Sequence, residues 1–161
     1  CQLYLEEEAQ HQRFEAEAGE RQLIHLATHA QFRQDDPLFS ALLLADGELT
    51  AQDLFNLELK ASLVTFSACE TGLGKLGGGD ELLGLSRACL YAGASSLVLS
   101  LWRVEDQSVA ELMQLFYTRL LAGRRKGAAL RLAQVTLLQS ESYRHPFFWA
   151  PFTLIGHAGL L

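Results

Sequence analysis

Residues 61–100, ASLVTFSACETGLGKLGGGDELLGLSRACLYAGASSLVLS, contain the pattern that decides the fold. The runs SLVTFS at 62–67 and SSLVLS at 95–100 are short and apolar, which is typical of strands buried on both faces of a sheet. Between them lie a glycine-rich loop and a segment that predicts a helix, capped by Asp80 and ending at about Tyr91. Strand, helix and strand in this order predict two parallel strands joined by a helical crossover.

The rest of the chain extends this alternation. Apolar runs at 22–28 and 152–155 predict two further strands of the same sheet. Amphipathic segments at 107–121 and 127–139 predict helices on its faces. The expected fold is therefore α/β, a three-layer α/β/α sandwich with a mainly parallel sheet. The other expected elements are an N-terminal helix at 2–18, a hairpin over 41–50 that turns at Asp46-Gly47, a helix from Thr50 to about Leu57 with Thr50 and Asp53 as a capping box, a cap at Asp106 or Ser108, and an aromatic loop at 144–151.

The composition excludes several classes of protein. The chain has 161 residues, of which 49% are hydrophobic, enough for one domain with a real core. Its net charge of -6 argues against nucleic-acid binding, and we interpret the one basic cluster, residues 124–126, as solvated. Three cysteines without CxxC spacing argue against disulfides and zinc and favour a reducing cytoplasm. No apolar run reaches the roughly 18 residues of a membrane span.

Chemistry is expected at the carboxyl ends of the strands, where the sites of open α/β sheets lie. His29 follows the strand at 22–28, and Cys69 follows the strand at 62–67. Neighbouring parallel strands would bring the imidazole and the thiol within reach of each other. A free thiol has a pKa near about 8.5, so it needs a base that accepts its proton and later protonates the leaving amine. The pair predicts a nucleophile at Cys69 and a general base at His29.

Two other motifs are weaker. Gly74-Lys75 in the glycine-rich loop lacks the serine or threonine and the spacing of a phosphate-binding loop. Ser86, within GLSRA, has part of a nucleophile-elbow motif, but it lies in the middle of an expected helix with no strand directly before it. Neither motif favours nucleotide binding or a serine hydrolase over the cysteine–histidine pair.

Most of the chain resembles the CHAT family, caspase-like peptidase domains often associated with TPR repeats. The similarity extends from residue 23 to about residue 156. The runs that carry it, in chain order, are HLATHA (25–30), PLFSALLLADGELTAQDL (37–54), LVTFSACETGLG (63–74), GGGDELLGLSRACLYAGASSLVLSLWRVED (77–106), LMQLFYTRLLAG (112–123) and HPFFWAPFTLIG (145–156).

The resemblance implies a caspase-like fold and a catalytic dyad of His29 and Cys69, with no metal or organic cofactor. The residue after the family's histidine is usually glycine. Here it is Ala30, whose backbone N–H is expected to form the oxyanion hole with that of Cys69. His25 is interpreted as structural. The family's upstream strands are absent, so we expect the remainder of a truncated helix at 1–20 and a partial catalytic domain at 21–161.

The substrate is expected to bind along SLWRVED, residues 100–106, by adding a strand beside Ser100. Trp102 would form the wall of a pocket, and Asp106 or Glu105 would select a basic P1 side chain. The alternative for Asp106 is a purely structural helix cap.

The predicted function is a cytoplasmic cysteine endopeptidase, a hydrolase that cleaves a protein substrate through a thioacyl-enzyme. A TPR or other sensor domain is expected upstream, with no binding of nucleic acid or membrane by this domain. The alternative is an inactive caspase-like scaffold or signalling module. The missing strands and Ala30 favour that alternative, whereas the intact Cys–His pair opposes it.

Overall fold

The computed structural model of the chain describes residues 1–31, 33, 35–67, 69–70 and 80–161, with the backbone alone at 69–70 and 80–83. Its main sheet has four strands in the order β1-β5-β7-β8. The first three are parallel, as predicted, and β8 runs antiparallel to β7. The strands are β1 (Leu23–Leu26), β5 (Leu63–Phe66), β7 (Ser96–Ser100) and β8 (Phe152–Gly156).

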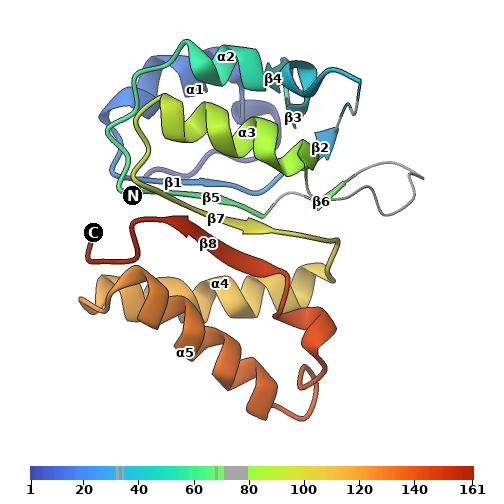
Figure 1. Cartoon of the computed structure of the whole chain (residues 1–161), viewed down its shortest axis with the longest axis vertical. Coiled ribbons are helices and arrows are strands. Elements are labelled where there is room, and N and C mark those ends of the chain that lie inside the picture. The colour runs from blue at the N-terminus through green and yellow to red at the C-terminus, as the bar shows by residue number, and fades with distance from the viewer. Residues whose placement is uncertain (32, 34, 68, 71–79) are drawn as a thin grey trace.

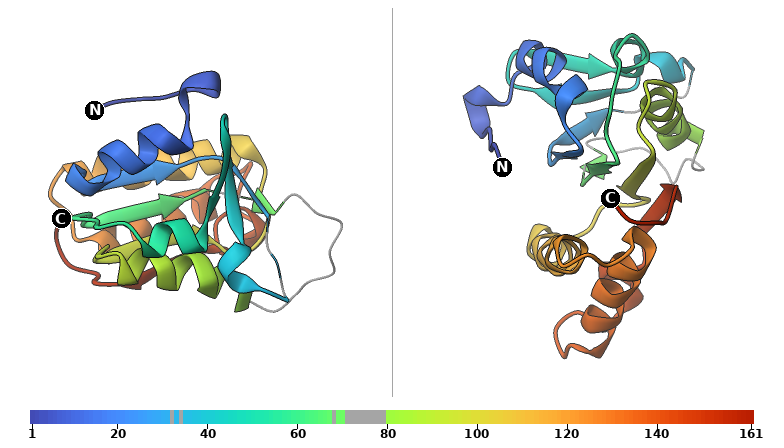
Figure 2. Two further views of the ribbon diagram at one scale, coloured as in Figure 1. Left: turned by 90° about the horizontal axis from the view of Figure 1, so that it is seen from above. Right: turned by 90° about the vertical axis from the view of Figure 1, so that its left-hand side faces the viewer.

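Helices cover both faces of the main sheet, which makes three layers (Figure 1). One group of helices lies over one face and a second group over the other, as the second view in Figure 2 also shows. The first group is α1 (His11–Glu17), α2 (Ala51–Phe55) and α3 (Asp80–Tyr91), and the second is α4 (Asp106–Leu121) and α5 (Lys126–Gln139). The mixed α/β architecture is compatible with the predicted caspase-like sandwich.

The strand residues divide by parity between two hydrophobic cores. In β5, Leu63 packs with α4 and α5, whereas Val64 and Phe66 pack with α2 and α3. In β7, Val98 packs with α4 and α5, whereas its neighbour Leu99 packs with α2 and α3. Because every residue of β5 and β7 is buried, these strands appear in the sequence as unbroken apolar runs rather than as alternating patterns.

A second, small sheet lies where β1 and β5 end, on the side of α2 and α3 (Figure 1). Its strand order is β4-β3-β2-β6. The sequence predicted the hairpin of this sheet and the capping box of α2, and both are confirmed. It did not predict that the residues after β1 and β5 would leave the main sheet. The strands are β2 (His29–Gln31), β3 (Ala41–Leu44), β4 (Gly47–Thr50) and β6 (Cys69–Glu70).

The prediction of one helix at 2–18 is wrong. The segment contains the 3₁₀ turns η1 (Glu6–Glu8) and η2 (Ala18–Glu20) on either side of α1. The break has a local cause, because Gln10 is extended and the Asp46 carboxylate accepts the backbone N–H of His11 at 2.5 Å. Asp46 therefore serves as the N-terminal cap of α1 from the β3–β4 turn.

The predicted cap of α4 is also wrong. Glu105 occupies the N-cap position without a side-chain hydrogen bond, and the Ser108 hydroxyl donates to its carbonyl at 2.8 Å. Asp106 is the first helical residue and is exposed to solvent. Its carboxylate is thus not committed to capping. The remaining 3₁₀ turns are η3 (Pro37–Phe39) and η4 (Pro146–Phe148).

Candidate active site

Two neighbouring chain segments pass together from the main sheet into the second sheet. In the main sheet, Leu23 pairs with Leu63 and Leu26 with Phe66. In the second sheet, His29 pairs with Cys69. All three pairs are 40 residues apart (63 − 23, 66 − 26 and 69 − 29). The register therefore stays the same where the two segments cross from the main sheet into the second sheet. The pairing of His29 with Cys69 follows from the register of the main sheet.

The backbone thus brings the two predicted catalytic residues to one register position. Neighbouring strands lie about 4.8 Å apart, and paired positions share a face of the sheet. His29 is exposed at this point, so its imidazole is accessible to solvent. The structure describes only the backbone of Cys69, and the thiol itself lies outside the described atoms. The sequence argument predicted this pairing from the strand ends.

Ala30 lies inside the second sheet. It pairs with Leu42 of β3 and with Glu70 of β6, and the residue is fully buried. Glu6 is the only described residue other than glycine with a positive φ, so the backbone at Ala30 does not require glycine. Alanine therefore fits this backbone position although the family usually has glycine there. The oxyanion-hole role of the N–H groups at Ala30 and Cys69 stays a prediction.

The predicted substrate segment begins where β7 ends. Ser100 is buried, and its hydroxyl donates to the Trp102 carbonyl at 2.6 Å, so this side chain shapes the turn rather than facing a ligand. The Leu101 N–H still pairs with Pro151 of the chain before β8. Beyond it, the backbone of Arg103 has no hydrogen bond to any described residue. β7 is an inner strand of the main sheet, so only the backbone beyond Leu101 is left to pair with an added strand.

Apolar side chains lie exposed beside this segment. Leu101 is 49% exposed, Trp102 37% and Phe147 46%. The Trp102 indole N–H donates to the Phe147 carbonyl at 3.1 Å, which ties η4 to the end of β7. Trp102 therefore lies against η4 and is partly exposed to solvent. Its role as the wall of a pocket stays a prediction.

His25 takes part in a polar cluster on the α4 face of the main sheet. Its Nε2 lies 2.5 Å from the Ser67 hydroxyl, and its ring lies 5.6 Å from that of Tyr117. The Tyr117 hydroxyl donates to Thr65 at 2.8 Å. Although His25 as a residue is accessible to solvent, partial desolvation of its ring lowers its pKa. The sequence analysis did not identify Ser67 and Tyr117 as neighbours of His25. The alternation of side chains along β1 indicates which face His25 occupies, but not which residues of other elements lie beside it.

The other nucleophile candidates lie elsewhere. Cys89 is buried in α3, and burial raises the pKa of its thiol to about 12. Ser86 is buried in the same helix. The interpretation of the basic cluster as solvated is wrong for Lys126, which is 1% exposed and donates to the Ser62 carbonyl at 2.9 Å. Gly74 and Lys75 lie outside the described residues.

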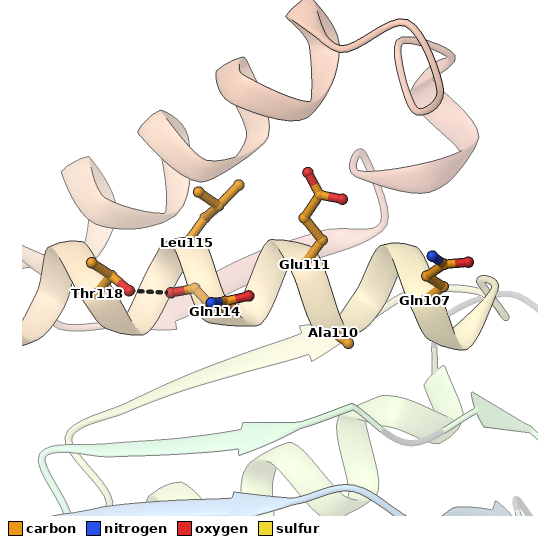
Figure 3. Close-up of a pocket in the computed structure, with 6 residues that line it drawn as sticks. All are labelled: Gln107, Ala110, Glu111, Gln114, Leu115 and Thr118. Atoms are coloured by element: carbon orange, nitrogen blue, oxygen red, sulfur yellow. Dashed lines mark hydrogen bonds between the residues drawn. The ribbon is translucent and has the colours of Figure 1, made fainter.

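A groove runs along α4 beside α5 (Figure 3), on the opposite side of the main sheet from β2 (Figure 1). Six residues of α4 line it, and Glu111 is the only one of these that titrates. Such a lining offers no pair of groups for acid–base work. Among the described side chains, no group of three or more His, Cys, Asp and Glu residues is arranged to hold a metal ion. No helix in the described part of the chain has the length and apolarity that a membrane span requires.

Comparison with known proteins agrees with the sequence resemblance. The CHAT domain family matches residues 1–157. Tetratricopeptide repeat protein 28 of Mus musculus is 38% identical over 108 residues, and its Homo sapiens counterpart is 36% identical over 108 residues. Each match covers 67% of this chain but only 4% of the relative. Both names refer to the repeats predicted to accompany this domain, and neither names an activity. The chain belongs to the CHAT domain family.

Proposed function

We propose that this chain is a cysteine peptidase domain in which Cys69 is the nucleophile and His29 the general base. The observation that carries the proposal is the backbone pairing of the two residues on parallel neighbouring strands. This pairing supports contact between a thiol and an imidazole with no other element in between. The membership of a caspase-like family supports the same roles.

The reaction runs in two halves. His29 takes the proton from the Cys69 thiol, and the thiolate attacks the carbonyl carbon of the scissile peptide bond. The carbon–nitrogen bond breaks, and the imidazolium gives its proton to the leaving amine. A water molecule then attacks the thioester while His29 accepts its proton, and the thiolate leaves as the acid product departs. The net reaction consumes one water for each peptide bond.

The substrate backbone would pair with Arg103, whose own backbone is unpaired among the described residues. Trp102 would contact an apolar side chain, and the exposed Asp106 carboxylate would attract a basic P1 side chain. This chemistry needs a reduced thiol, so the reducing cytoplasm is the compartment that suits it. An upstream TPR segment would serve as the sensor that controls the site.

The test is labelling by an irreversible peptide-based thiol probe, read by intact mass. Wild type should gain one adduct, Cys69→Ala none, and His29→Ala should be slower by about 10²-fold or more. His157→Ala is the matched control, because His157 is also exposed but follows β8 at the opposite edge of the main sheet.

Two results would contradict the proposal. One is labelling of Cys69 no faster than that of the exposed Cys1, and the other is equal labelling in His29→Ala and wild type. Either result would favour the inactive scaffold. Probes with basic, acidic and apolar P1 groups, compared on wild type and Asp106→Asn, would test the pocket. A preference for basic P1 that persists in Asp106→Asn would exclude Asp106 as its source.

A further inference from the structure

The second sheet holds Cys69 by a very short ladder. β6 has two residues, Cys69 and Glu70, and β2 has three. A slip of one residue would move Cys69 out of line with His29 and onto the other face of the sheet. A two-residue ladder has too few hydrogen bonds to prevent such a slip. The register must therefore be imposed from the main sheet, through the residues that precede Cys69.

Ser67 is the last described residue before Cys69 that is bonded to the neighbouring segment. Its backbone N–H donates to the Leu26 carbonyl at 3.1 Å, which continues the ladder by one residue beyond β5. Its hydroxyl bonds His25 Nε2 at 2.5 Å. The bond from His25 is diagonal, because the register partner of His25 is Thr65 and not Ser67. Backbone and side chain thus hold Ser67 from two directions.

His25 is itself fixed from the helix side of the sheet. The ring of Tyr117 in α4 lies 5.6 Å from the imidazole and tilted by 32°. The Tyr117 hydroxyl donates to the fully buried Thr65. The Tyr117 ring, and not its hydroxyl, contacts the imidazole and limits its lateral movement, so the bond to Ser67 has a defined direction. β1, β5 and α4 together support one hydrogen bond at the point of crossing.

We propose that His25 is a positioning residue, whose bond to Ser67 fixes where the chain leaves the main sheet and thereby the register of Cys69 on His29. The catalytic part of this inference rests on the proposed function. The structural part, that the bond holds the backbone at Ser67 and at 69–70, does not depend on any activity.

Four variants separate this role from general stability. His25→Phe keeps a ring against Tyr117 but loses the bond, and Ser67→Ala removes only the hydroxyl. His25→Gln retains a side-chain amide, which can donate or accept this hydrogen bond, and serves as the rescue. Tyr117→Phe is the matched control, because it removes a hydrogen bond of the same cluster that does not involve Ser67.

The first readout is amide hydrogen exchange over residues 67–70, and the second is the limiting rate of Cys69 labelling at saturating probe. We expect faster exchange in His25→Phe and Ser67→Ala, with a limiting rate lower by about 10- to 100-fold for an ångström-scale displacement. The double variant should be no worse than either single, because both remove one interaction. His25→Gln should recover most of the rate, and Tyr117→Phe should match wild type.

Unchanged exchange at 67–70 in both His25→Phe and Ser67→Ala would overturn the inference, as would an equal loss in Tyr117→Phe. A wild-type protein that does not label would refute the peptidase proposal alone, because the exchange measurement still decides whether His25 holds the crossing. Wild-type labelling with a normal limiting rate in Ser67→Ala would refute the positioning role and leave the peptidase proposal intact.

Discussion

Leu42→Ala tests whether the second sheet depends on the hydrophobic core that it shares with the main sheet. Leu42 is fully buried and pairs with Ala30 of β2 and Leu49 of β4. The change removes three carbons, worth roughly 2.4 kcal/mol at about 0.8 kcal/mol each. A residual cavity raises the expected loss in free energy of unfolding to about 3–5 kcal/mol. For a domain of this size, a loss of about 3 kcal/mol lowers Tm by roughly 6–12 °C.

Leu54→Ala is the matched control for this prediction. Leu54 belongs to the same core cluster and is equally buried, but it lies in α2 rather than in the second sheet. Urea unfolding should give similar losses for the two variants. Amide exchange at residues 29–31 should rise more in Leu42→Ala, because only that variant loosens the strand next to His29.

Two outcomes would refute the reasoning. A loss below about 1 kcal/mol for Leu42→Ala would mean that the second sheet is not anchored by this core, since even modest core truncations cost more. Equal exchange at 29–31 in both variants would mean that β2 responds to the core as a whole and not to β3. Contacts other than the packing of β3 would then have to hold His29 in position.

Three further predictions concern residues at the start of α2, in α3 and at the start of α5. Thr50→Ala should lower the free energy of unfolding, measured in urea, by about 1 kcal/mol, because Thr50 Oγ1 accepts the Asp53 N–H at 3.1 Å. A loss no larger than that of an alanine substitution at an exposed position would contradict the capping box. Cys89 should resist thiol reagents in the folded protein, because a pKa of about 12 leaves roughly one thiolate in 10⁴ molecules at pH 8. Rapid modification of Cys89 in the native protein would contradict its burial. Burial lowers the pKa of Lys126 below the ordinary 10.5, so the unfolded chain binds more protons in the alkaline range beneath that value. Wild-type stability should therefore rise with pH there relative to Lys126→Met, and a pH-independent difference between the two would refute this assignment.

The main sheet was predictable because its strands are buried on both faces. The apolar runs at 62–67 and 95–100 correspond to β5 and β7 within a residue at each end. α5 was likewise predicted within one residue of its observed start at Lys126. In these elements, local preference and burial favour the same structure, so sequence patterns are sufficient.

The second sheet was not predictable in the same way. A strand of two or three residues, such as β6 or β2, is too short to show a period of two. The break at Gln10 depends on Asp46, which lies 35 residues from His11 along the chain. The bond between His25 and Ser67 spans 42 residues. Such contacts depend on tertiary structure and leave no local pattern.

The pairing of His29 with Cys69 was nevertheless expected, and the constant offset of 40 residues explains why. Two parallel segments that leave one sheet after the same number of residues keep their register in the next sheet. Only the lengths of the segments that join the two sheets must match. Two residues of sequence separate β1 from β2, and two separate β5 from β6. An insertion in one crossing alone would shift the pair by one position and place the two residues on opposite faces. The geometry of the proposed dyad therefore depends less on the second sheet itself than on the equal lengths of the segments that lead into it.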